Sequence, residues 1–196
     1  MTALRRGFKA EANGIAREVR QELGLRVADP LDPRSLAAHL EIPILPLTDL
    51  RRDAADAVRR FTGVNRGEFS GVTVFGGPRR MIVYNDSHAP SRRASDLAHE
   101  LAHALLQHAP RPALDGAGCR YWDPVIEKEA SWLAGALLVS DEAAFEVARS
   151  GMSIEEAATK YGVSPKMMQF RLGVSGARAR ADRASSWRTK AGRGNA

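Results

Sequence analysis

The chain has 196 residues, 44% of them hydrophobic, and a net charge of +6, which is enough apolar material for one ordinary core. No stretch approaches the roughly 18 consecutive apolar residues of a membrane-spanning helix, and no apolar signal-peptide segment follows the first charged residues. Cys119 is the only cysteine, so an intrachain disulfide is excluded. We therefore predict a cytoplasmic protein without membrane contact.

The amino-terminal half mixes helical and strand-like patterns. Apolar residues recur at helical spacing from Phe8 to Leu23, which predicts a first helix. Asp32-Pro33, a capping residue followed by proline, is typical of the start of a second helix. The sequence then predicts a strand over residues 42–47, a helix over 49–61, and two strands over 69–75 and 81–84.

The second half is predicted to be helical, with a loop over residues 109–124. Helices are expected over residues 97–106, 126–138, 140–151, 153–161 and 164–173. The last two resemble a helix-turn-helix, and the first of them begins with the capping box Ser153-Ile154-Glu155-Glu156. A small sheet beside helices makes this an α+β fold. We predict a catalytic domain over 1–150, a helix-turn-helix-like segment over 151–173 and a flexible basic tail over 174–196.

The stretch His99-Glu100-Leu101-Ala102-His103 reads H-E-x-x-H inside an apolar helical pattern. On a helix of about 3.6 residues per turn, His99 and His103 point the same way and can share a metal ion. Glu100 lies on the same side but is displaced from the metal, so it can take a proton from bound water. The motif predicts one Zn²⁺ per chain, with His99 and His103 as ligands and Glu100 as general base. The alternative is a pair of helix histidines that bind no metal.

A zinc peptidase site needs a third protein ligand. One known arrangement places a third histidine six residues after the second, but that position is Ala109, and His108 lies one residue short. The following helix offers two glutamates. Glu129 shares the apolar stripe of that helix, whereas Glu127 lies outside it. We therefore predict Glu129 as the ligand, with Glu127 as the second choice; Glu127 can instead be an exposed first-turn glutamate.

These residues resemble the ImmA/IrrE family of metallo-endopeptidases. Residues 99–106 and 129–138 are similar to its H-E-L-x-H-x-L-L and E-A-N-x-F-A-x-x-L-L segments, and the likeness spans roughly residues 10–173. Ser131 stands where that family usually has Asn, which leaves ligands and base in place. The resemblance implies a gluzincin-like zinc site and cleavage of a protein substrate, often a helix-turn-helix repressor.

Peptide hydrolysis also needs a group that stabilises the oxyanion besides the metal. Tyr121, Arg92 and His108 are the candidates, and the sequence does not choose among them. Each also has a simpler role. Tyr121 can pack its loop, Arg92 can pair with Asp96 one turn further on, and His108 can cap the helix or lie on the surface.

Residues 153–196 offer a different function. Residues 174–196 contain six basic residues and one acidic residue, and with Lys166, Gln169 and Arg171 they can contact DNA weakly. Alternatively, the helix pair packs on the catalytic domain through its Met and Phe side chains, and the tail is solvated. The alternatives to a zinc endopeptidase are therefore a DNA-binding regulator with a structural zinc site and a toxin-antitoxin module controlled by a partner.

Overall fold

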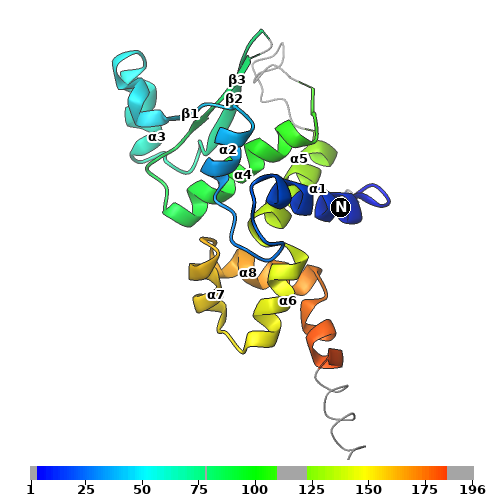
Figure 1. Ribbon diagram of the computed structural model, residues 1–196. Coiled ribbons are helices and arrows are strands. Elements are labelled where there is room, and N and C mark those ends of the chain that lie inside the picture. Colours follow the sequence, from blue (N-terminus) through cyan, green and yellow to red (C-terminus); the bar gives the residue numbers. More distant parts are fainter. Residues whose placement is uncertain (1–3, 78, 110–122, 185–196) are drawn as a thin grey trace, which may run out of the picture.

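The computed structural model describes residues 4–77, 79–109 and 123–184 (Figure 1). It is mostly helical with a small sheet, which agrees with the predicted α+β class. The elements are α1 (Phe8–Glu22), α2 (Pro33–His39), β1 (Ile44–Pro46), the 3-10 helix η1 (Leu47–Arg52), α3 (Ala55–Thr62), β2 (Gly71–Gly76), β3 (Arg79–Tyr84), α4 (Pro90–Leu105), α5 (Pro124–Leu138), α6 (Asp141–Ser150), α7 (Ile154–Lys160) and α8 (Pro165–Val174). None of the helices in the described ranges is both long and apolar enough to cross a membrane.

Several helices begin at the capping residues that the sequence predicts. The Asp32 side chain accepts the Arg34 amide at the start of α2, and Ser153 with Glu156 forms the capping box of α7. The structure differs from the prediction over residues 49–61, where two separate helices, η1 and α3, replace the single helix expected. Ala54 between them has φ −142° and ψ 52°, a non-helical backbone conformation that separates the two.

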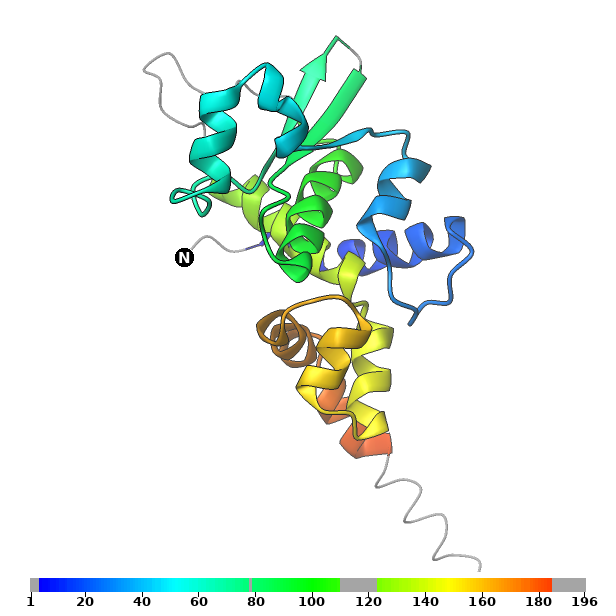
Figure 2. The same ribbon diagram turned by 90° about the vertical axis from the view of Figure 1, so that its left-hand side faces the viewer.

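The sheet has three strands in the order β1-β3-β2. β1 runs parallel to β3, and β2 runs antiparallel to it with Val72 opposite Val83. Successive side chains of β3 point to opposite faces, so Ile82 enters the main core while Val83 joins a smaller cluster with Leu47 and Val58. Helix α4 packs beneath β2 and β3 (Figure 2). The edge strand β2 therefore runs beside the helix that carries the H-E-x-x-H motif.

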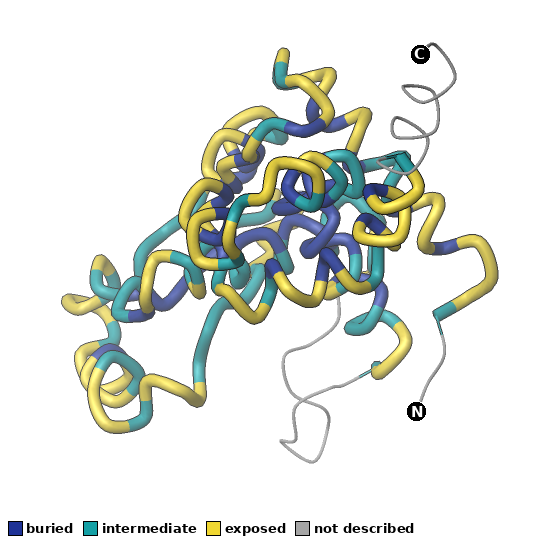
Figure 3. Tube along the Cα trace, turned by 90° about the horizontal axis from the view of Figure 1, so that it is seen from below, coloured by how far each residue is buried: buried dark blue, intermediate teal, exposed yellow. Residues whose placement is uncertain are grey.

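Helices α4 and α5 form the centre of the molecule. α5 packs most extensively against α4 and also lies along α1. Buried alanines line both central helices, and small side chains allow close helix packing. These residues are Ala98 and Ala102 on α4, and Ala130 and Ala134 on α5. Buried residues lie in the middle of the molecule and exposed residues around it (Figure 3). Of its neighbours, α4 packs most extensively against α5.

Two fully buried arginines hold the carboxyl-terminal end of α5. Arg20 of α1 donates from Nη2 to the carbonyl of Leu137, 2.7 Å away, and Arg171 of α8 donates from Nε to the carbonyl of Val139, 2.9 Å away. Desolvation by burial lowers the pKa of Arg20 to about 10 and also lowers the pKa of Arg171. Both side chains keep their charge at neutral pH, and they occupy the carbonyls that a helix end leaves without partners.

The buried position of Arg171 corrects one sequence-based expectation. Its Nη2 donates to Asp141 at 2.8 Å and its exposed fraction is 0%. Arg171 therefore cannot make the DNA contact that the sequence analysis considered. α8 instead packs through Met168 and Leu172, which belong to the main core. Phe170 contacts the edge of Trp132 but is 45% exposed. The helix pair thus shares a core with the rest of the chain, as in the alternative in which it packs on the catalytic domain.

Candidate metal centre

Three metal-binding side chains meet where α4 crosses the start of α5. His99 Nε2 lies 3.1 Å from His103 Nε2 and 3.2 Å from Glu127 Oε2, and His103 Nε2 lies 3.8 Å from Glu127 Oε1. Among the described residues these three make the one group of His, Cys, Asp or Glu that can hold a metal ion. The helical spacing of four aligns the two histidines, and the packing of α5 on α4 brings in the glutamate.

The spacing of these donor atoms fits a small tetrahedral ion. Zinc binds His nitrogen and carboxylate oxygen at about 2.0–2.2 Å, which places donors of a tetrahedral site roughly 3.3 Å from one another. The observed separations of 3.1, 3.2 and 3.8 Å lie around this value. Two imidazoles and one carboxylate are also the donors of zinc sites that keep a position for water. The residues present therefore fit zinc.

The electrostatic setting favours neutral imidazole at His103. Desolvation by burial, with smaller contributions from the nearby His99 and His108, lowers the pKa of His103 to about 4, while Glu127 acts in the opposite direction. A neutral imidazole offers a nitrogen lone pair, which an imidazolium does not. At neutral pH His103 can thus bind a metal ion without first losing a proton.

The third member of the cluster is Glu127, the second choice of the sequence analysis, rather than the predicted Glu129. The Glu129 carboxylate is not a member of the donor cluster; Arg5 Nε, in the chain before α1, lies 3.0 Å from its Oε1. This contact is an ion pair without hydrogen-bond geometry. Glu129 is buried, as its place in the apolar stripe predicted, whereas the Glu127 side chain is 20% exposed. The cluster lies beside the apolar stripe of α5 rather than within it.

Glu100 is held next to the edge strand of the sheet. Thr73 of β2 donates its hydroxyl to Glu100 Oε2 at 2.6 Å. A Cβ atom at Gly71, on the same face of β2, would lie 3.7 Å from Glu100 Cγ and 4.0 Å from Oε1. These are ordinary contact distances, so a Cβ would just fit at Gly71, whereas a longer side chain would reach the Glu100 carboxylate. The carboxylate of Glu100, the predicted general base, is therefore oriented by β2, through a contact that no local sequence pattern predicts.

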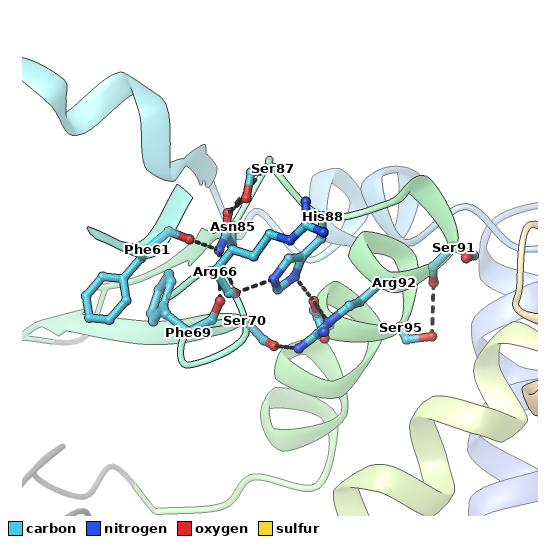
Figure 4. A network of polar contacts seen from close by, with 11 residues as sticks. Phe61, Arg66, Phe69, Ser70, Asn85, Ser87, His88, Ser91, Arg92 and Ser95 are labelled. Atoms are coloured by element: carbon cyan, nitrogen blue, oxygen red, sulfur yellow. Dashed lines mark hydrogen bonds and ion pairs between the residues drawn. The ribbon is translucent and has the colours of Figure 1, made fainter. Parts of the chain in front are cut away.

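The segment leading into β2 is fixed by a buried amide (Figure 4). Asn85 follows β3 and is fully buried. Its Nδ2 donates to the backbone carbonyls of Phe61, Arg66 and Phe69, at 2.7, 3.3 and 3.0 Å. Its Oδ1 accepts the amide and hydroxyl of Ser87. One side chain thus satisfies several backbone groups of a loop that has no regular structure.

His88 and Arg92 anchor the same segment. His88 Nδ1 lies 3.1 Å from Asp96 Oδ2, and Nε2 lies 2.7 Å from the Arg66 carbonyl oxygen. Both ring nitrogens of His88 are therefore in contact with an oxygen of the segment or of α4. Arg92 donates to the Ser70 hydroxyl at 3.0 Å and, as predicted, lies near Asp96, at 3.9 Å (Figure 4).

The predicted oxyanion stabilisers have different positions in the structure. Arg92 precedes His99 by seven residues, about 10 Å along a helix, and its contact with Ser70 ties it to the loop. His108 lies against His103, with the two Nδ1 atoms 2.9 Å apart. Tyr121 lies outside the described residues, and its role stays a prediction.

A sequence comparison places this site in a known family. The sequence model of peptidase family M78, the IrrE N-terminal-like domain, matches residues 49–173. The chain belongs to this family. The matched range is more than half of the chain and includes the motif, Glu127 and both strands of the hairpin. No curated protein matches the chain. Membership in a peptidase family agrees with a protein substrate and with hydrolysis as the chemistry of the site.

Proposed function

We propose that this protein is a zinc-dependent endopeptidase that cleaves a regulatory protein. The observation that carries the proposal is the convergence of His99 Nε2, His103 Nε2 and the Glu127 carboxylate. Glu100, which follows His99 in the motif, has its carboxylate bound by the Thr73 hydroxyl at 2.6 Å. Among the described residues, three side chains rather than four form this group, and the motif adds the carboxylate of Glu100; this combination is typical of a catalytic site rather than a structural one. Membership in peptidase family M78 also supports a catalytic site.

The roles of the residues follow from their positions. His99, His103 and Glu127 would hold the ion, which when bound supplies Lewis-acid polarisation of the peptide carbonyl and of water. Glu100 accepts a proton from the attacking water and passes it to the leaving amine. The hydroxyl of Thr73 donates to Oε2 of that carboxylate, which restricts the orientation of the Glu100 side chain.

The outer edge of β2 is the proposed binding site for the substrate backbone. In the described part of the chain the sheet ends at β2, and an edge strand offers unpaired backbone groups to an extended peptide. Val74 and Phe75 of this strand are 45% and 38% exposed. A peptide that pairs with β2 would pass beside Gly71 and Thr73, the two residues that flank Glu100.

The proposed substrate is a helix-turn-helix transcriptional repressor in the cytoplasm, an inference that rests on the family resemblance. The tail and the exposed Lys166 and Gln169 remain candidates for weak DNA contact, which would bring the peptidase close to such a substrate.

The test compares the wild-type protein with Glu100→Gln. Both are loaded with zinc and incubated with a cell extract, and newly formed amino termini are identified by mass spectrometry. We expect equal zinc content, and new termini in a helix-turn-helix regulator with the wild type only. Equal zinc content with no termini that depend on Glu100 would refute the endopeptidase. Termini confined to proteins of other kinds would refute the proposed substrate class.

A further inference from the structure

His103 contacts His108 through Nδ1, the ring nitrogen that does not face the donor cluster. His103 turns Nε2 toward His99 and Glu127, while its Nδ1 lies 2.9 Å from Nδ1 of His108. The two rings meet edge to face, with centroids 4.9 Å apart and planes at 68°. For Nε2 to offer a lone pair in a neutral ring, the proton must sit on Nδ1. His103 Nδ1 is then the donor and His108 Nδ1 the acceptor.

The backbone after α4 places His108 there. Gln107 has φ 52°, the left-handed conformation that glycine adopts most readily. The His108 amide donates to the His103 carbonyl at 3.0 Å and the Gln107 amide to the Ala104 carbonyl at 3.1 Å, the bonding pattern of a Schellman helix end. This turn reverses the chain over the last turn of α4, so the His108 ring lies back on His103. Gln107, which is not a glycine, thus adopts an unfavourable backbone conformation at the turn that brings His108 to His103.

The corresponding contact of the other histidine ligand is longer. His99 Nδ1 lies 3.4 Å from the Ser131 hydroxyl, at the limit of hydrogen-bond distance. Both imidazoles thus turn Nε2 inward and Nδ1 outward, but His103 has the closer outer partner. His108 itself is not a member of the donor cluster, because it approaches the far side of His103.

We propose that His108 is a positioning residue of the metal site: its Nδ1 accepts the Nδ1 proton of His103 and so fixes the ring with Nε2 directed at the ion. The proposal rests on the proposed function, since the ion it serves is that of the peptidase. It gives His108 a role other than the oxyanion stabiliser or surface residue that the sequence suggested. Outer partners of metal-binding histidines fix the tautomer and ring orientation, and their loss typically weakens metal binding about 10–100-fold.

The first test measures metal binding with two substitutions. His108→Ala removes the acceptor, whereas the Oδ1 atom in His108→Asn can take the place of Nδ1. We expect the zinc affinity, measured by chelator competition, to fall about 10–100-fold in His108→Ala and to return close to the wild-type value in His108→Asn. The visible spectrum of the Co²⁺-loaded protein should change in the Ala variant alone. His39→Ala, which removes an exposed histidine of α2, is the control.

The second test does not require a metal ion. Nitrogen-15 NMR of the metal-free protein should show His103 as the Nδ1–H tautomer in the wild type and in His108→Asn, and as a mixture in His108→Ala. Unchanged affinity, cobalt spectrum and tautomer in His108→Ala would overturn the proposal. An Asn variant as defective as the Ala variant would show that His108 only fills space. If the wild type bound no zinc, the proposed function would fail, while the tautomer measurement would still decide whether His108 orients His103.

Discussion

Glu127 Oε2 lies 3.2 Å from His99 Nε2, which joins the first turns of α5 to the motif helix. Two residues further on, Glu129 pairs with Arg5 instead. This difference provides a matched pair of substitutions. Glu127→Ala should lower the zinc affinity by at least about 100-fold, beyond the usual effect of losing an outer partner of a ligand. Glu129→Gln should change it less than about 3-fold, because only its ion pair with Arg5 is lost.

Chelator competition on both variants measures the difference, with circular dichroism to establish that each is folded. A Glu129→Gln variant that lost zinc while Glu127→Ala retained it would restore the original sequence-based choice and would contradict the arrangement of α5 described here.

The glycine beside the general base leads to a second prediction. Gly71→Leu places a branched side chain where a Cβ alone would lie 3.7 Å from Glu100 Cγ, so the carboxylate has to move. Small displacements of catalytic groups cost up to about 100-fold in rate, and we expect kcat on the confirmed substrate to fall at least about 10-fold with zinc content unchanged. Gly76→Leu, at the other end of β2, meets nothing within 4 Å and should keep kcat. Equal kcat values for the two variants would refute the close fit at Gly71.

Asn85 is expected to dominate the stability of the segment before β2. Asn85→Ala leaves the carbonyls of Phe61 and Phe69 without their donor, and an unsatisfied buried polar group costs about 1–3 kcal/mol. We predict a loss of about 2–4 kcal/mol in the free energy of unfolding, measured by urea titration. Asn65→Ala, in the same segment but with an exposed side chain, should stay within about 0.5 kcal/mol. A loss in Asn85→Ala as small as that in Asn65→Ala would show that the hydrogen bonds of Asn85 contribute little to stability.

The pKa of His103 predicts how the metal-free protein responds to acid. The folded-state pKa is about 4, against about 6.5 in an unfolded chain, so the unfolded state binds a proton first as the pH falls. The stabilising contribution is complete above about pH 6.5 and is lost between pH 6.5 and 4, by on the order of 2 kcal/mol. Urea titrations in EDTA across this range should show the slope, and His103→Asn should flatten it. An equally steep slope in that variant would assign the effect to other groups.

The arrangement of the helices and strands follows closely from local sequence signals, because each signal acts within a few residues. Asp32, Ser140 and Ser153 cap the helices that they were expected to start. The motif histidines converge because their spacing on one helix fixes their direction. These features need no knowledge of distant contacts, so one sequence is sufficient to predict them.

The sequence alone does not predict that Glu127, rather than Glu129, lies beside the histidines, because this depends on how α4 and α5 cross. The prediction assumed that the ligand shares the apolar stripe of α5. On that side of the helix lies Glu129, which pairs with Arg5. The side facing the motif carries Glu127 and, one turn later, Ser131, which reaches His99. Small residues at Ala130 and Ala134 on α5 were the available signal, since close helix packing needs them. The contact of Thr73 with Glu100 spans 27 residues and has no local signal.

The two buried arginines, Arg20 and Arg171, limit how far the chain can be shortened before it no longer folds. The family match begins at residue 49, yet Arg20 of α1 and Arg171 of α8 both bind carbonyls at the end of α5, the helix that begins with Glu127. α1 also supplies Phe8, Ala12 and Ala16 to the core. A fragment trimmed to the matched range would leave apolar surface of α5 exposed and the Leu137 carbonyl without its donor. The cooperative folding unit is therefore wider than the recognisable sequence signature, and it extends from α1 to α8.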